Sequence, residues 1–231
     1  MPTSAHPPRM ALVDTGAIPG GGRLRLFRDG PHYVIKLDDG TDLMSTRAHG
    51  SEEALAQQAA LRLGARPAAQ WLVGGLGIGY TLAAALRQVG ADARVTVAEL
   101  VPAVVAWNRD WLGAFAGHPL ADARAQLHEG DVAELLRGAG RRWDAILLDV
   151  DNGPEGITRA GNDWLYAPAG LRAIRAALRA GGVLAVWSAH SAPAFTRRLA
   201  EAGFAVEELP ARALGRRGQR HRLWLAQARP A

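Results

Sequence analysis

Residues 71–79, WLVGGLGIG, constrain the fold more strongly than any other stretch of the sequence. A short apolar run leads into four glycines, and a helical pattern over residues 80–90 follows directly. Because glycine has no Cβ, such a turn lets backbone N–H groups and the dipole of the following helix face an electron-rich ligand. The stretch therefore predicts a strand, a tight turn and a helix that together form a nucleotide- or nucleoside-type site.

Strand-like and helix-like patterns alternate through the rest of the chain. The further predicted strands are residues 94–99, 124–128, 143–149 and 183–188, with a closing hairpin at residues 204–209 and 221–226. Helical patterns fill the connections, among them residues 102–112 and 168–179. This alternation is typical of a parallel sheet covered on both faces. We therefore expect an α/β fold with a doubly wound, mostly parallel, seven-stranded Rossmann-like sheet and a C-terminal antiparallel strand.

The first 50 residues show a different pattern. After a polar tail at residues 1–8, short apolar runs are separated by turn-forming sequences; the runs are residues 10–13, 23–27, 33–37 and 43–45. This spacing predicts a small antiparallel unit of two β-hairpins, a candidate lid or dimer surface. We therefore divide the chain into this tail and hairpin unit, residues 1–50, and a nucleoside-binding domain, residues 51–231. Ser51 is predicted to cap the first helix of that domain, with Glu52 in its first turn.

The composition excludes several classes of site. The chain of 231 residues is 48% hydrophobic and has no cysteine, which excludes disulfides, thiolate catalysis and Cys-ligated metals. No two histidines have metal-ligand spacing, so we assign no metal. The N-terminal residues show no secretory leader, and no apolar run approaches the roughly 18 residues of a membrane span. We therefore expect a cytoplasmic protein with no membrane partner. The net charge of +5 comes from scattered arginines, so a nucleic-acid partner is not expected.

Residues suited to chemistry follow four of the predicted strands in turn. They are Gly74, Gly75, Gly77 and Gly79 after the first strand, Glu99 at the end of the second, Asp131 after the third, and Asp149 with Asp151 at the fourth. In a doubly wound sheet, ligands bind outside the carboxyl ends of the strands. An acid about twenty residues after the glycine turn is placed to accept the hydroxyls of a ribose. These positions together predict a nucleoside site.

A dinucleotide is the first alternative ligand. The dinucleotide fingerprint G-x-G-x-x-G would require a glycine at position 82, which is Leu82. The turn formed by Gly130 and Asp131 is no part of that fingerprint, and it suits the exocyclic amine of an adenine. The balance favours S-adenosylmethionine, or a relative of it, over a dinucleotide.

The run from residue 71 to residue 187 resembles the spermidine synthase family, the aminopropyltransferase branch of the Rossmann-like S-adenosylmethionine-dependent methyltransferase superfamily. The resembling segments are VGGLGIG, AELVPAVV, HEGDV, WDAILLDVDNGPEG and LYAPAGL. The resemblance implies that the donor nucleoside is bound by Gly74, Gly75, Gly77, Gly79, Glu99, Leu100, Asp131 and Val132. In it, Glu99 holds the ribose, and Asp131 with Val132 holds the adenine. Asp149 and Asp151 are the implied catalytic residues, and Asp149 faces the attacking amine.

The chain also departs from the pattern of that family. Gly77 stands where the family has an aspartate that binds the amino end of the donor. The pair Ser51-Glu52 replaces a Tyr-His pair of the family. Asp151 follows Asp149 by two residues instead of three, and Asn152 takes the remaining place. Candidate acceptor-site residues are Glu52, Asn152, Glu155 and Tyr166.

The sequence thus predicts a spermidine synthase-like transferase that uses S-adenosylmethionine or its decarboxylated form as co-substrate. It would transfer an aminopropyl or a methyl group to a small acceptor, an amine such as a polyamine, because the loop after Asp149 is acidic within a basic chain. A methyltransferase acting on another small molecule and a nucleoside-binding protein without catalysis stay open as alternatives. The family resemblance and the N-terminal hairpins also predict a homodimer.

Overall fold

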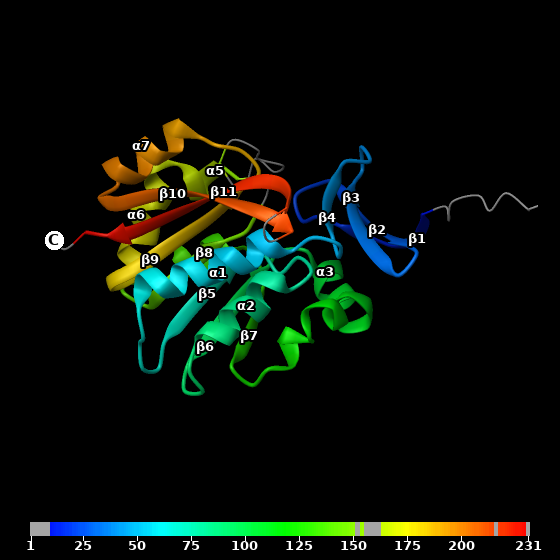
Figure 1. Cartoon of the computed structure of the whole chain (residues 1–231), viewed down its shortest axis with the longest axis horizontal. Helices are drawn as coiled ribbons and strands as arrows, with labels where there is room; N and C mark the ends of the chain where they lie inside the picture. Colours follow the sequence, from blue (N-terminus) through cyan, green and yellow to red (C-terminus); the bar gives the residue numbers. More distant parts are fainter. Residues whose placement is uncertain (1–9, 151–152, 155–162, 215–216, 230–231) are drawn as a thin grey trace, which may run out of the picture.

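The computed structural model describes residues 10–150, 153–154, 163–214 and 217–229, which form two β-sheets and the helices around the larger one (Figure 1). In the described part of the chain, the helices are all too short or too polar to cross a membrane. The predicted α/β class is confirmed, with a small antiparallel sheet followed by a larger, mostly parallel one.

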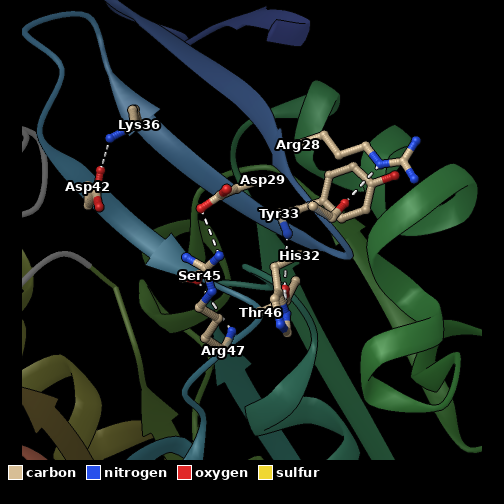
Figure 2. A network of polar contacts seen from close by, with 10 residues as sticks. Arg28, Asp29, His32, Tyr33, Lys36, Asp42, Ser45, Thr46 and Arg47 are labelled. Atoms are coloured by element: carbon tan, nitrogen blue, oxygen red, sulfur yellow. Dashed lines mark hydrogen bonds and ion pairs between the residues drawn. The ribbon is translucent and has the colours of Figure 1, made fainter. Parts of the chain in front are cut away.

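The N-terminal sheet has four antiparallel strands in chain order: β1 (Ala11–Ala17), β2 (Arg23–Asp29), β3 (His32–Leu37) and β4 (Asp42–Ser45). The two predicted hairpins therefore form one continuous sheet. Polar contacts fix its last turn (Figure 2): the hydroxyl of Thr46 accepts a hydrogen bond from the Tyr33 N–H at 3.0 Å, and Arg47 pairs with Asp29 at 2.7 Å. These contacts hold the segment that leaves the sheet toward the rest of the molecule.

Three contacts attach the N-terminal sheet to the larger part. The Tyr80 hydroxyl donates to the carbonyl of Thr46 at 3.1 Å, and the Trp107 indole donates to Asp14 at 2.7 Å. Gly16 of β1 lies so close to Ala103 that an added Cβ would be 2.2 Å from the Ala103 Cβ. The apolar core also runs without a break from the N-terminal sheet into the larger one. The small sheet is thus packed in place and is not a loosely tethered unit.

The larger sheet has seven strands in the order β10-β11-β9-β8-β5-β6-β7. Their bounds are β5 (Gln70–Gly74), β6 (Arg94–Glu99), β7 (Ala125–Glu129), β8 (Trp143–Leu148), β9 (Leu178–Ser188), β10 (Phe204–Leu214) and β11 (Arg217–Ala228). Strands β5 to β9 are mutually parallel, and β11 runs antiparallel to β9. The direction in which strands are added reverses between β5 and β8, and ligands of doubly wound sheets bind at such a switch point.

The helices cover both faces of the larger sheet, as the alternating pattern predicts. One face carries α1 (Gly50–Leu63), α2 (Tyr80–Gln88) and α3 (Pro102–Trp107); the other carries α4 (Val132–Leu136), α5 (Asp163–Tyr166), α6 (Pro168–Ala177) and α7 (Pro193–Glu201). Neighbouring side chains of β5 point to opposite faces, so that Trp71 and Val73 enter the first core and Leu72 enters the second. Both faces of β5 are buried, which explains its uninterrupted apolar sequence.

Three local predictions are wrong. Ser51 does not cap α1, because the helix begins at Gly50 after His49 and the Ser51 side chain bonds elsewhere. The helix predicted at residues 168–179 ends at Ala177, and the Gly-Gly pair that follows lies inside β9. The helix predicted at residues 102–112 is α-helical only to Trp107 and continues as one π-helical turn, Asn108–Leu112.

Gly79→Ala should destabilise the protein more than the matched variant Gly117→Ala. Both glycines have left-handed φ angles, +96° and +75°, which cost another residue roughly 1–2 kcal/mol. At Gly79 a Cβ would also lie 2.9 Å from Pro119 Cγ, whereas nothing lies within 4 Å at Gly117. Overpacking adds about 1–3 kcal/mol, measurable by urea unfolding. Equal losses in the two variants would contradict the close packing assigned to the start of α2.

Candidate functional site

A cavity of about 230 Å³ lies between the N-terminal sheet and the carboxyl ends of the parallel strands. Eight of the residues predicted from the sequence line it: Glu52, Gly75, Gly77, Glu99, Leu100, Asp131, Val132 and Asp149. They come from four strand ends and from α1, so the fold brings together side chains that are up to about a hundred residues apart. The N-terminal sheet adds an apolar wall that includes Leu24, Leu37, Leu43 and Met44.

The glycine loop after β5 packs directly against the end of β8. The Gly75 N–H donates to the Ala98 carbonyl at 2.9 Å, and the Asp149 N–H donates to the Gly74 carbonyl at 3.0 Å. Gly75 has a φ of +85°, and a Cβ there would lie 2.6 Å from the Asp149 carbonyl oxygen. Any side chain at this position would force the two strand ends apart. Gly74 and Gly79 are not among the residues lining the cavity; Gly74 packs on Leu148 within β8.

Glu99 holds the glycine loop from the neighbouring strand. Its Oε2 accepts from the Leu76 N–H at 2.9 Å, and its Oε1 accepts from the Val101 N–H at 2.8 Å. The side chain is 8% exposed, and burial raises the pKa of its carboxyl, although the backbone donors oppose that shift. A carboxylate fixed in this way presents its remaining lone pairs to the cavity, where hydroxyl donors can bind. Glu99 lines the cavity, and the binding of a ribose by its carboxyl stays a prediction.

Asp131 lies at the start of α4, where it caps the helix. Its Oδ1 accepts from the Ala133 N–H at 2.9 Å, the usual arrangement of an N-cap aspartate. Asp131 and Val132 both line the cavity, next to Gly130. The cap fixes the orientation of the carboxylate, and the second oxygen stays available on the cavity side for a donor such as an exocyclic amine.

Asp149 ends β8 at the centre of this arrangement. The Thr81 hydroxyl, from the first turn of α2, donates to its Oδ2 at 2.5 Å. Burial raises the pKa of the Asp149 carboxyl to about 7, and the nearby Glu52 carboxylate adds to the rise. A carboxyl with this pKa exchanges a proton near neutral pH, which is the property required of a general base.

Glu52 brings a second carboxyl to the cavity, from the first turn of α1. Burial also raises its pKa, and the hydrogen bond from the Ser51 hydroxyl, 2.6 Å from Oε2, acts in the opposite direction. Of the two predicted acceptor-site residues that the structure describes, Glu52 lines the cavity and Tyr166 does not. Tyr166 is buried against Phe195, and its hydroxyl donates at 3.1 Å to the carbonyl of Val150, which is a lining residue. The predicted site residues Asp151, Asn152 and Glu155 lie outside the described residues.

Sequence reasoning missed four residues of this region: Met44, Thr81, Trp187 and His221. Thr81 and Trp187 line the cavity, His221 contacts Ser51, and Met44 covers the glycine loop. A Cβ on Gly77 would lie 3.1 Å from the Met44 Sδ. The one local signal that could have identified Thr81 is its position as a polar residue in the first turn after the glycine loop. The others depend on tertiary contacts that no local pattern shows.

Within the described residues, no cluster of three or more histidine or acidic side chains is suited to a metal ion.

The comparisons with known proteins identify the fold. No protein-family model and no curated protein matches the sequence. A spermidine synthase from Thermotoga maritima matches 94% of this chain and 72% of its own length, with 18% identity and a TM-score of 0.73. A spermidine synthase in complex with the transition-state analogue AdoDATO matches over the same fractions, with 19% identity and a TM-score of 0.73. TrmN from Thermus thermophilus matches 77% of this chain and 48% of its own, with 22% identity and a TM-score of 0.55.

Asp149→Asn should change how stability depends on pH. Because the pKa of Asp149 is raised to about 7 in the folded protein, the protonated form stabilises the fold below pH 4, and this contribution is lost as the pH rises toward 7. The neutral amide has no such dependence. The variant should therefore gain stability relative to wild type between pH 4 and 7, by at most about 1.4 kcal/mol per pH unit.

Urea unfolding at several pH values measures this difference. Asp110→Asn, at an exposed position, is the control and should follow the wild-type profile. Parallel profiles for wild type and Asp149→Asn would show that Asp149 is not buried in the manner described.

Proposed function

We propose that this chain is a transferase that binds an adenosyl-sulfonium donor, S-adenosylmethionine or its decarboxylated form, and alkylates a small amine. The observation that carries the proposal is the convergence of the glycine loop, Glu99, Asp131 and Asp149 on one cavity at the switch point of the sheet. The shared fold with a spermidine synthase, and with one crystallised with AdoDATO, supports the same donor class.

In this proposal, each of the polar residues of the cavity has a separate role. Glu99 would hold the ribose and Asp131 the adenine, so that the donor is fixed at both ends of its nucleoside. The bound donor supplies a carbon activated by its sulfonium, whose C–S bond breaks as the acceptor nitrogen forms the new N–C bond. Asp149 would accept the proton that the amine loses, since its pKa of about 7 matches neutral conditions. Thr81 would orient that carboxyl by its hydrogen bond.

Methyl transfer is the second form of this proposal, and the glycine loop favours it. Where the resembling family has an aspartate for the amino end of its donor, this chain has Gly77 with Met44 packed above it. A thioether cannot replace a carboxylate as the partner of an ammonium group. The loss of that ion pair weakens the case for a decarboxylated donor and leaves the nucleoside part of the site unchanged. A nucleoside-binding protein without catalysis is the remaining alternative.

A thermal-shift series with S-adenosylmethionine, its decarboxylated form, methylthioadenosine and NAD tests the donor class. A ligand at 100 times its dissociation constant stabilises the folded state by about 2.7 kcal/mol. For a chain of this size, each kcal/mol raises the melting temperature by roughly 2–4 °C. The sulfur nucleosides should give such shifts and NAD should not. A shift with NAD alone would refute the donor assignment.

Gly77→Asp combined with Met44→Ala should increase the preference for the decarboxylated donor. The alanine makes room for the new side chain, and the aspartate supplies a charge for the ammonium while repelling the carboxylate of the intact donor. We expect the ratio of the two dissociation constants, measured by calorimetry, to move at least about tenfold, or 1.4 kcal/mol. Gly77→Asn with Met44→Ala is the matched uncharged control. An equal change in the control would assign the effect to shape rather than charge.

A further inference from the structure

Three polar side chains at the start of α1 and on β11 are joined by two hydrogen bonds in series. His221 Nδ1 lies 2.8 Å from the Ser51 Oγ, and the same Oγ lies 2.6 Å from Glu52 Oε2. Ser51 is fully buried and His221 is 8% exposed, although 170 residues separate them in the sequence. Buried polar groups of this kind are costly unless paired, so the contact is a specific feature of the packing between α1 and β11. It is also the reason why Ser51 does not serve as a helix cap.

The two outer residues of this hydrogen-bonded series, Glu52 and His221, line different cavities. Glu52 lines the active-site cavity together with Asp149. His221 lines a second cavity of about 990 Å³, between the start of α1 and the β10–β11 hairpin. Trp187, which lines the first cavity, packs edge-on against the His221 ring with centroids 4.7 Å apart. The imidazole therefore stands at the boundary between the active site and a cavity on another side of the molecule.

The hydrogen atoms in the two hydrogen bonds that join Glu52, Ser51 and His221 can be arranged in two ways. When Glu52 is ionised, the Ser51 hydroxyl donates to it, so His221 must donate to Ser51 through an Nδ1–H. When Glu52 carries a proton, it can donate to Ser51, and Ser51 then donates to an unprotonated Nδ1. Conversion of the second arrangement into the first moves one proton from Glu52 to His221, and the Nε2–H can then leave to water in the second cavity. Only hydrogen atoms move in this transfer; before the next one, the ring must regain its Nε2–H tautomer, by rotation or by proton exchange with water.

We propose that Glu52, Ser51 and His221 form a proton relay that carries the proton released by the acceptor amine from the active-site cavity to the second cavity. The proposal rests on the proposed function for the origin of the proton. Asp149 takes that proton from the amine and passes it to the neighbouring Glu52, from which it crosses Ser51 to His221. In this scheme Ser51 and His221 are positioning residues, because neither touches the reacting atoms.

The electrostatic surroundings set the balance of this transfer. Burial raises the pKa of Glu52 and lowers that of His221, to which the nearby His190 also contributes, so the transfer from Glu52 to His221 is less favourable than between the same groups in water, and an imidazolium formed there loses its proton readily. Other titratable and charged groups lie around these three side chains. On the helices and after the parallel strands they are His49 and Glu53 near the start of α1, Tyr80 on α2, Asp149 after β8 and His190 after β9. On the closing hairpin they are Arg212 of β10 and Arg220 and Arg222 of β11. Glu53 and Asp149 both disfavour ionised Glu52, so Glu52 takes up a proton readily, and its onward transfer is driven by the loss of the His221 Nε2 proton to water in the second cavity.

The first test uses the full chain and the variant His221→Asn. The asparagine amide can still donate to Ser51 but cannot gain or lose a proton. With the donor that binds best, and with 1,4-diaminobutane and 1-aminobutane as acceptors, we expect kcat to fall at least about tenfold and KM to stay within about twofold. His118→Asn, at an exposed position that lines neither cavity, is the matched control and should keep wild-type kinetics. Wild-type turnover by His221→Asn across the pH range would overturn the relay.

Chemical rescue separates proton transfer from a structural role. In His221→Ala, the second cavity offers space for free imidazole, which should restore at least half of the lost kcat and shift the pH profile toward its own pKa. A merely structural histidine would not respond in this way. A loss of activity that imidazole and other small buffers leave unchanged would overturn the relay and assign His221 to packing.

A third measurement does not depend on catalysis. The ¹⁵N shifts of the His221 ring should show the Nδ1–H tautomer while Glu52 is ionised, and Ser51→Ala should abolish the effect of Glu52→Gln on that tautomer. An Nε2–H tautomer at high pH in the wild type would overturn the relay even if the donor assignment holds. Failure of the thermal-shift series with a correct tautomer would instead refute the proposed function alone.

Discussion

The contact between the glycine loop and the end of β8 is the constraint on which the site depends. A Cβ on Gly75 would lie 2.6 Å from the Asp149 carbonyl oxygen, and the loop backbone bonds to both neighbouring strands. Because parallel strands end on the same edge of the sheet, this contact places Asp149 directly beside the glycine loop. Glu99 completes the arrangement from the other side by accepting from the Leu76 N–H. Backbone N–H groups therefore orient the carboxyl groups of Glu99 and Asp131, and the hydroxyls of Thr81 and Ser51 orient those of Asp149 and Glu52.

The N-terminal sheet decides what the loop can bind. Its strand β4 places Met44 over Gly77, and Leu37 and Leu43 extend the apolar wall. The hydrogen bond from Tyr80 to Thr46 and the close packing of Gly16 on Ala103 hold this wall in place. A ligand thus meets carboxyl groups on the side of the parallel sheet and hydrocarbon on the other. Such a cavity suits a molecule that is polar at one end, and it gives the small sheet a direct role in specificity.

Local pattern explains why so much of the fold was predictable. Strand ends, glycine turns and apolar periodicity are short-range features, and they located β5 to β8, the N-terminal strands and eight of the residues that line the cavity. The failures have a common cause. Ser51 looked like a helix cap, yet its hydroxyl is taken by His221, 170 residues away. The bonds of Thr81 and the cover of Met44 likewise depend on how elements pack, and a single sequence holds no local record of that packing.

Glu52 and Asp149 bring two carboxyl groups into one cavity, and a site of this kind needs a route by which protons can leave. Glu52 and Asp149 raise each other's cost of ionisation, and burial adds to it, so at neutral pH the pair tends to retain a proton. A cationic amine entering the cavity reverses this preference, because its charge stabilises both carboxylates. In the proposed reaction, binding would then release one proton, and the reaction of the amine would release another. An apolar wall offers no exit for either, whereas the Ser51 hydroxyl, already bonded to Glu52, does. Ser51 and Glu52, which stand where the resembling family has a Tyr-His pair, would thus both serve the proposed proton transfer.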